Sequence, residues 1–142
     1  MLDLRQAVKE ELVPQASPLQ LRIVAHMKSR SFGDELVDLR TGDLLVRVLR
    51  DRGRLFAEFG SSSQPGVWFD SSVVLEYLGL SATYSFHDED LTHSLRGIGL
   101  FLRTMKDELK GLFSIDTFPQ LRPILETIQK QQVENDLNIK LP

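Results

Sequence analysis

The sequence predicts a single α+β domain, with an antiparallel sheet toward its N-terminus and helices after it. Residues 43–60 have the pattern of a β-hairpin, because two apolar-rich runs flank a turn signal. Residues 87–113 carry a regular apolar stripe that is typical of a long amphipathic helix. Because strand patterns followed by helical patterns favour an α+β fold, we expect a roughly four-stranded meander with a short N-terminal helix. Three C-terminal helices should follow, the longest of them packed on one face of the sheet.

The composition is that of an ordinary globular protein. The chain has 142 residues, enough for one domain with a sizeable core. Its net charge is −3 and its basic residues are spread along the chain, so it lacks the basic footprint of a nucleic-acid binder. The absence of cysteine excludes disulfides, thiolate catalysis and Cys-containing zinc sites. Without a signal-peptide pattern or an apolar run near the ~18 residues of a transmembrane helix, we expect a cytoplasmic protein with no membrane partner.

The first predicted element is a helix over residues 1–13. Asp3 can cap this helix, and Gln6 stands where the second residue of a capping box belongs. Pro14 follows as a stop signal.

The predicted sheet spans residues 19–60. Residues 19–28 alternate apolar and polar side chains, with a break only at Val24, and this alternation favours a strand. A helix over the same residues stays open, since Ser17-Pro18 is also a helix-start signal. Glu35–Arg40 is expected to be a second, short strand.

The hairpin over residues 43–60 is predicted to turn at Arg52-Gly53. Pairing outward from this turn sets Asp51 against Arg54, Leu49 against Phe56, Arg47 against Glu58 and Val46 against Phe59. Opposite charges and apolar side chains then meet across the strands, which stabilises a sheet. A slip by one residue would set Val46 against Glu58, so the pattern favours a single register.

Three helices are predicted over residues 70–79, 87–113 and 117–134. The stripe of the second consists of Leu91, Leu95, Ile98, Leu102, Met105, Leu109 and Leu112. Gly97 and Gly99 weaken this helix by roughly 1 kcal/mol each relative to alanine. Their presence there would allow the close approach of a neighbouring element.

The segment HDEDLTH, residues 87–93, is the strongest candidate for chemistry. Imidazole and carboxylate groups are ligands for zinc, manganese or iron, and Asp90 and His93 would share one face of a helix. A helical two-histidine zinc motif needs histidines four apart, whereas His87 and His93 are six apart. Acids at a helix N-terminus are the simpler interpretation, because they complement the macrodipole. We therefore expect no metal and no other cofactor, and keep a metal-dependent enzyme using His87, Asp90 and His93 as an alternative.

The sequence contains no Gly-x-Ser-x-Gly nucleophile motif, Walker motif or Gly-x-Gly-x-x-Gly, so a binding role is favoured over catalysis. Candidate contacts with a protein partner are Arg50, Arg52 and Arg54, which cluster near the hairpin tip. Trp68 and Phe69 are further candidates, since aromatic residues beside polar loops often anchor interfaces. Alternatively, neighbouring acids neutralise the arginines, and Trp68 closes one end of the core.

The runs SFGDELV at residues 31–37 and RDRG at residues 50–53, followed by Trp68, resemble a pattern of small bacterial α+β proteins. Some proteins of this kind are encoded beside polymorphic or contact-dependent toxins and act as their immunity proteins. The resemblance covers about residues 19–80 and implies a protein that neutralises a toxin by occlusion, without catalytic residues. A homodimeric structural or regulatory subunit, joined through the striped helix, is the further alternative.

Overall fold

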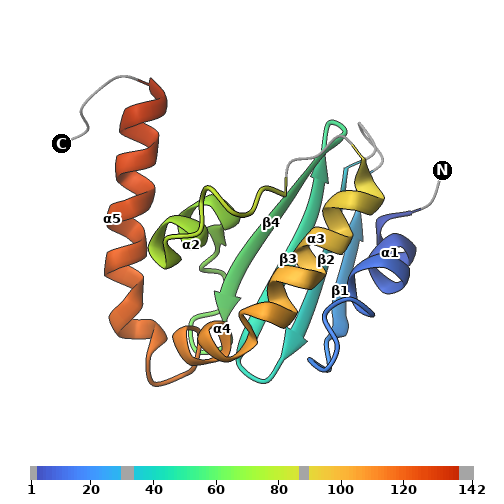
Figure 1. Cartoon of the computed structure of the whole chain (residues 1–142), viewed down its shortest axis with the longest axis horizontal. Coiled ribbons are helices and arrows are strands. Elements are labelled where there is room, and N and C mark those ends of the chain that lie inside the picture. The colour runs from blue at the N-terminus through green and yellow to red at the C-terminus, as the bar shows by residue number, and fades with distance from the viewer. Residues whose placement is uncertain (1–2, 30–33, 87–89, 138–142) are drawn as a thin grey trace.

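In the computed structural model, the described part of the chain, residues 3–29, 34–86 and 90–137, forms a five-stranded antiparallel sheet with helices on one face (Figure 1). The strands, which pair in chain order, are β1 (Arg22–Lys28), β2 (Glu35–Thr41), β3 (Leu44–Asp51), β4 (Arg54–Ser61) and β5 (Phe69–Asp70). The helices are α1 (Leu4–Ala7) with the π-helical segment η1 (Val8–Leu12), α2 (Ser71–Leu78), α3 (Leu91–Thr104), α4 (Lys106–Leu112) and α5 (Phe118–Leu137). The predicted α+β class is confirmed, and β5 is an additional strand.

The β3–β4 hairpin has the predicted register. The structure pairs Asp51 with Arg54, Leu49 with Phe56, Arg47 with Glu58 and Val46 with Phe59. Both turn residues have positive φ, 51° at Arg52 and 80° at Gly53, as a two-residue type I′ turn requires.

Strand β1 contains a bulge where its sequence pattern breaks. Ile23 pairs with Leu39 and Ala25 pairs with Asp38, which leaves Val24 as an extra residue. Ile23 therefore shares a face with the buried Leu39, whereas Met27, beyond the bulge, points to the opposite face and is 67% exposed. The strand interpretation is confirmed, with a change of phase at Val24.

The N-terminal helix begins as predicted but lacks the full capping box. Asp3 Oδ1 accepts a hydrogen bond from the Gln6 N–H at 2.7 Å. The Gln6 side chain, however, reaches forward to Glu10 instead of back to Asp3. Gln6 could accept from the Asp3 N–H through its side-chain oxygen, but it donates its Nε2–H to Glu10 Oε1, and the spacing alone does not distinguish the two bonds.

The predicted helix over residues 87–113 is two helices, and residues 87–89 lie outside the described residues. The chain departs from helical geometry at Met105, with φ −105° and ψ 21°. This change directs Leu109 and Phe113 into the core, where both are fully buried. The longest helix is α5, which packs against α2 beside the sheet, so it is α3 and not the longest helix that covers the sheet (Figure 1).

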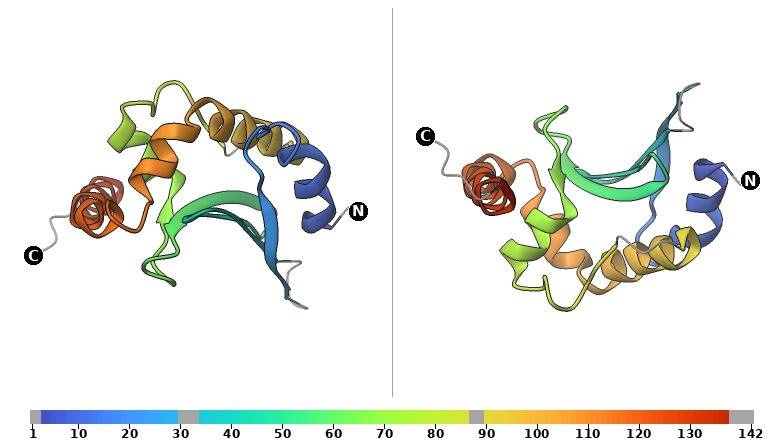
Figure 2. Two further views of the ribbon diagram at one scale, coloured as in Figure 1. Left: turned by 90° about the horizontal axis from the view of Figure 1, so that it is seen from below. Right: turned by 90° about the horizontal axis from the view of Figure 1, so that it is seen from above.

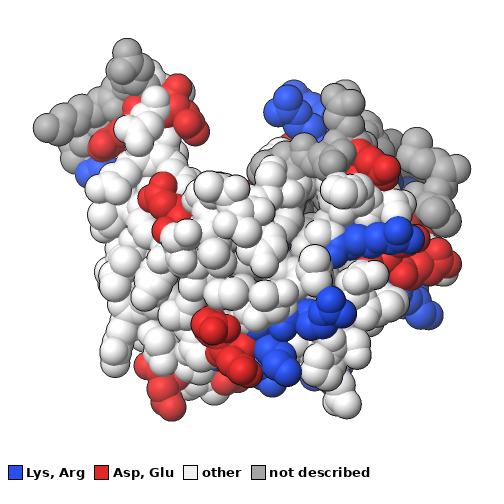
Figure 3. Space-filling model, viewed as in Figure 1, with Lys and Arg blue, Asp and Glu red and all other residues white. Residues whose placement is uncertain are grey.

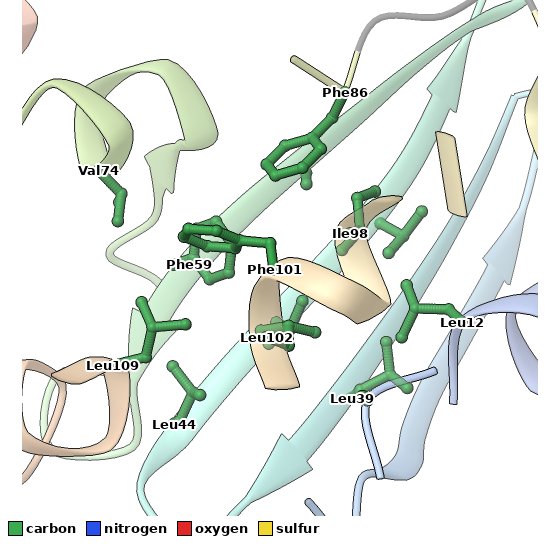
Figure 4. Packing of buried hydrophobic residues seen from close by; sticks show 14 of the residues in the cluster. Leu12, Leu39, Leu44, Phe59, Val74, Phe86, Ile98, Phe101, Leu102 and Leu109 are labelled. Atoms are coloured by element: carbon green, nitrogen blue, oxygen red, sulfur yellow. The ribbon is translucent and has the colours of Figure 1, made fainter. Parts of the chain in front are cut away.

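One face of the sheet and the helices form the core. The most deeply buried sheet residues are Val37, Leu39, Leu44, Val46, Val48, Ala57 and Phe59. Figure 4 shows Phe101 of α3 beside Phe59 of β4, and their rings meet edge to face with centroids 6.0 Å apart. The stripe residues Leu95, Ile98 and Leu102 are fully buried in this core, whereas Leu91, Met105 and Leu112 are only partly buried.

The sheet is curved, and the helices lie on its convex side (Figure 2). Between β1 at one edge and the β4–β5 connection at the other, no described helix lies over the concave side (Figure 2). The concave side is therefore the part of the sheet that the fold leaves uncovered.

Gly99 is the point of closest approach between α3 and the N-terminal segment. A β-carbon at this position would lie 2.5 Å from the Leu12 carbonyl oxygen and 2.7 Å from Gln15 Cβ. At Gly97 the nearest atom would be Phe86 Cδ1, at 3.9 Å. The close approach expected at these glycines is thus confirmed for Gly99 only.

We predict that Gly99→Ala lowers the free energy of unfolding by about 1–3 kcal/mol, because the added methyl group overpacks the contact with η1. The matched variant Gly97→Ala should leave stability unchanged or raise it by up to about 1 kcal/mol, since only helix propensity changes there. Urea denaturation of both variants measures the difference. Equal effects would contradict the close contact at Gly99.

Candidate functional site

The concave face of the sheet is the candidate functional site. On the central strands β2, β3 and β4, the side chains that point to this face are half-buried. The residues that alternate with them point to the core and are buried. The surface, called the open face below, comprises Ala25, Met27, Leu36, Asp38, Arg40, Leu45, Arg47, Leu49, Asp51, Arg54, Phe56, Glu58 and Asp70. A sheet face turned to water normally carries polar side chains. Here leucine, phenylalanine and methionine side chains share it with the charged ones.

Charged side chains cross the middle of the open face in one row. The strand register aligns Asp38, Arg47, Glu58 and Asp70, which lie on β2, β3, β4 and β5. Arg47 donates two hydrogen bonds to Asp38, from Nε to Oδ1 at 2.8 Å and from Nη2 to Oδ2 at 3.0 Å. This bidentate bond raises the pKa of Arg47. The guanidinium therefore pairs with Asp38 and not with Glu58, its other cross-strand neighbour.

Trp68 reaches over this row from the connection between β4 and β5. Its ring centroid lies 4.2 Å from Arg47 Cζ, which is a cation–π contact. Gly60 makes room for the ring, because a β-carbon there would lie 2.9 Å from the Val67 carbonyl oxygen and 3.2 Å from Trp68 Cε3. Trp68 is half-buried and thereby extends the open face beyond β4.

Glu58 is the least satisfied member of the row. Among the described residues its carboxylate has no hydrogen-bond partner or ion pair within contact distance. Burial raises the pKa of Glu58, and the carboxylates of Asp70 and Asp38 raise it further, against the lowering effect of Arg47. The row thus holds more negative than positive charge at neutral pH.

The predicted contact residues lie at separate places on the sheet. Arg54 is exposed at the hairpin tip, on the side of the open face. The backbone N–H of Arg52 donates to Asp34 Oδ1 at 3.0 Å, so this turn residue is tied to β2. Since Arg54 is six residues from Gly60 along β4, about 20 Å separate the tip from Trp68. The open face lies between these two ends.

Two of the predicted contacts point away from the open face. Phe69 is 2% exposed and packs edge to face on Phe118, so the structure corrects its interpretation as a surface anchor. Adjacent strand residues point to opposite faces, and this puts Phe69 in the core beside the outward Asp70. Arg50 also points to the helix-covered side, where Nη2 lies 2.6 Å from Glu35 Oε1.

Sequence reasoning paired Arg47 with Glu58 but missed the rest of the row. The sequence contains the turn signal Thr41-Gly42 before β3, and in the structure Gly42 has a φ of 58°. Pairing outward from that turn sets Thr41 against Leu44 and Asp38 against Arg47, as the structure does. Asp70 carried no such signal, because β5 is only two residues long and follows an irregular connection.

A hollow of about 370 Å³ continues the open face toward the start of β2. Met27, Leu36 and Leu49 line it, and Glu35 and Arg50 also contribute to its lining. Its lining is mostly apolar, which extends the apolar part of the open face toward β1.

Glu35 is a buried carboxylate that joins three elements. Its two oxygens accept from the Leu4 N–H at 3.1 and 3.2 Å, and Oε2 lies 3.0 Å from His26 Nε2. Together with the Arg50 bond, these contacts hold α1, β1 and β3 together. Burial opposes ionisation of this group, but the bonds from His26 and Leu4 and the charges of Arg50 and Lys28 outweigh it, so the pKa of Glu35 is lowered.

The HDEDLTH segment does not form a recognisable site in the described residues. His87 lies outside them. Asp90 caps α3, and its Oδ1 accepts from the His93 N–H at 3.3 Å. Within the part of the chain that is described, no three histidine or carboxylate side chains gather as a metal-binding group.

The charged residues that Figure 3 shows on the helix-covered side are arranged differently. Figure 3 shows that the Lys and Arg side chains and the Asp and Glu side chains on this side are scattered, with wide uncharged areas between them. None of the described helices is both long and apolar enough to cross a bilayer.

No protein-family model matches the chain, and neither curated proteins nor solved structures give a match. The functional argument therefore starts from the open face itself.

We predict that Glu35→Gln lowers the free energy of unfolding by about 3 kcal/mol at neutral pH, because it removes the charge that Arg50 faces in a buried pair. The folded pKa of Glu35 is lowered, so its stabilisation is complete above the unfolded value of about 4.3 and is lost as pH falls through the folded value. Stability of the variant should thus fall less steeply in acid than that of the parent chain. Urea denaturation between pH 7 and pH 3 measures this, with the exposed Glu108→Gln as control; identical slopes for Glu35→Gln and its parent would contradict it.

We also predict that Gly60→Ala displaces Trp68 from Arg47, because the added methyl group meets the ring and the backbone of Val67. Trp68 is the only tryptophan of the chain, so its emission reports on this site alone. The emission maximum should move to longer wavelength and quenching by acrylamide should increase. Gly111→Ala, where a β-carbon would meet nothing within 4 Å, should leave both unchanged. An unaltered spectrum of Gly60→Ala would disprove the packing of Trp68 on the open face.

Proposed function

We propose that this chain is a non-catalytic protein-binding protein and that the open face is its binding surface. The observation that carries the proposal is a concave sheet face with Leu45, Leu49 and Phe56 on it and no described element over it. Apolar side chains left on an uncovered face of a globular protein are a common mark of an interaction site. Aromatic and arginine side chains, here Trp68 and Arg47, are the types most enriched where partners bind tightly.

The open face is also preorganised, which favours binding over chemistry. Strand pairing fixes the backbone of β2, β3 and β4, and Arg47 is held by Asp38 on one side and Trp68 on the other. Side chains that are ordered before binding lose less entropy when a partner arrives. Occlusion by such a surface needs shape and charge complementarity and no reactive group.

The sequence resemblance supports a particular form of this function, an immunity protein that covers the working surface of a toxin. In that form Arg54 at the hairpin tip and Trp68 at the far end of β4 would mark the limits of the contact area. Arg52 would contribute at the tip as well, whereas Arg50 and Phe69 would act from within the fold.

The proposal is tested by capturing the partner with tagged protein in the native host and identifying it by mass spectrometry. We expect one stoichiometric partner, lost on Leu49→Glu because a charge then stands in the apolar part of the open face. Leu100→Glu is the matched control, since Leu100 lies on the outer side of α3 and is 42% exposed. Thermal unfolding of both variants shows that they are folded. A partner retained by Leu49→Glu, or lost equally by both variants, would contradict the proposal.

A further inference from the structure

Two carboxylates face each other on the open face with no cation between them in the described residues. Glu58 and Asp70 are cross-strand partners on β4 and β5. Like charges directly opposite each other destabilise a sheet. Asp70 has a structural use, because its Oδ2 accepts from the Ser72 N–H at 2.9 Å and caps α2. Glu58 makes no such bond within the described residues; burial raises its pKa, and the nearby carboxylate of Asp70 adds to this, against the lowering effect of Arg47.

The arginine of this row is already engaged. Arg47 directs both of its hydrogen bonds to Asp38 and stacks its guanidinium under Trp68. Turning it toward Glu58 would break the bidentate bond and the cation–π contact together. Arg47 therefore acts on Glu58 through its charge but directs its hydrogen bonds to Asp38.

The other arginines of the open face lie at its ends. Arg40 donates its Nε–H to the Gly42 carbonyl at 2.8 Å, at the turn between β2 and β3. Arg54 is the cross-strand partner of Asp51 and lies about 13 Å from Glu58 along β4. The charged groups that act on Glu58 are Arg47, Asp70 and Asp38.

Apolar side chains lie on both sides of the row. Leu49 and Phe56 are paired across β3 and β4 on one side of it, and Leu45 lies on the other. A partner that covers these side chains excludes water from the row as well, and charge interactions strengthen when water leaves. An acidic or uncharged group placed there would leave the Glu58 carboxylate desolvated, without a hydrogen-bond partner in the described part of the chain and opposite the carboxylate of Asp70, which is unfavourable.

We propose that the partner places a lysine or arginine side chain between Glu58 and Asp70, with apolar neighbours against Leu45, Leu49 and Phe56. This inference rests on the proposed function and adds the chemistry of the partner to it. The occupant of the open face is thus a protein segment in which a basic residue is flanked by apolar residues.

A random-peptide library displayed on phage, selected against the full chain, provides the probe. We expect the selected peptides to be enriched in lysine or arginine beside apolar residues. Synthetic copies should bind Glu58→Gln/Asp70→Asn at least about tenfold more weakly by fluorescence anisotropy. Asparagine caps helices as well as aspartate does, so the cap of α2 is kept. The control Asp107→Asn/Glu108→Gln makes the same change in net charge at exposed positions of α4 and should bind like the parent.

Thermal unfolding separates binding from folding in this test. Glu58→Gln should not lower the melting temperature, because the side chain it replaces is an unpaired, partly buried acid. If the weaker binding came from a structural role of Glu58, the melting temperature would fall with it.

The outcomes distinguish this inference from the proposed function. Selected peptides that lack basic residues, or that bind both double variants alike, overturn the inference; if they still fail to bind Leu49→Glu, the open face remains the binding surface. Peptides that bind Leu49→Glu as well as the parent overturn both. No enrichment above that on an unrelated protein also counts against both.

Discussion

Burial of one face of the three central strands, β2, β3 and β4, is the constraint on which the rest of this structure depends. Val46 and Val48 of β3 and Phe59 of β4 are fully buried beneath the helices. Burying each such side chain contributes about 1.5–3 kcal/mol. Because side chains alternate along a strand, the same geometry sends Leu45, Leu49 and Phe56 to the concave side. The helices cover the convex side only (Figure 2), so the open face follows from how the core is made.

Two glutamates on opposite faces of the sheet differ in their hydrogen bonds and in the direction of their pKa shifts. Glu35, on the covered side, has hydrogen bonds to the Leu4 N–H, His26 and Arg50, and its pKa is lowered. Glu58, on the open face, lies opposite another carboxylate and its pKa is raised. A carboxylate whose bonds are complete belongs to the structure of the free chain. One without a hydrogen-bond partner among the described residues is available to a cationic group of a second molecule, and this is the physical basis of the proposed basic residue on the partner.

The part of the fold that could be predicted from the sequence is the part set by local pairing. The register of the β3–β4 hairpin follows from which side chains meet across the Arg52-Gly53 turn, and the bulge of β1 is visible as the break at Val24. The break at Met105 was not predictable in this way, because the apolar stripe continues through it and no glycine or proline marks it. Its cause is tertiary, since the next helix turns to bury Leu109. The Asp38–Arg47 pair could have been predicted in the same way from the turn before β3. Asp70 could not, because it joins Glu58 only through the two-residue strand β5.

The stability of the free chain does not account for the side chains on the open face. A glutamine at position 58 would avoid the repulsion from Asp70, and polar residues at positions 45 and 49 would suit a face turned to water. Arg47, by contrast, is bonded so completely to Asp38 and Trp68 that it adds rigidity to this face. Arg47 and Trp68 are thus rigid, while Glu58 has no hydrogen-bond partner among the described residues and the leucines beside it are partly exposed. This combination favours a surface that binds a second molecule. Glu58 and the apolar residues of the open face do not favour the stability of the free chain, and other residues could stand in their places. A role in binding is the simplest explanation for them.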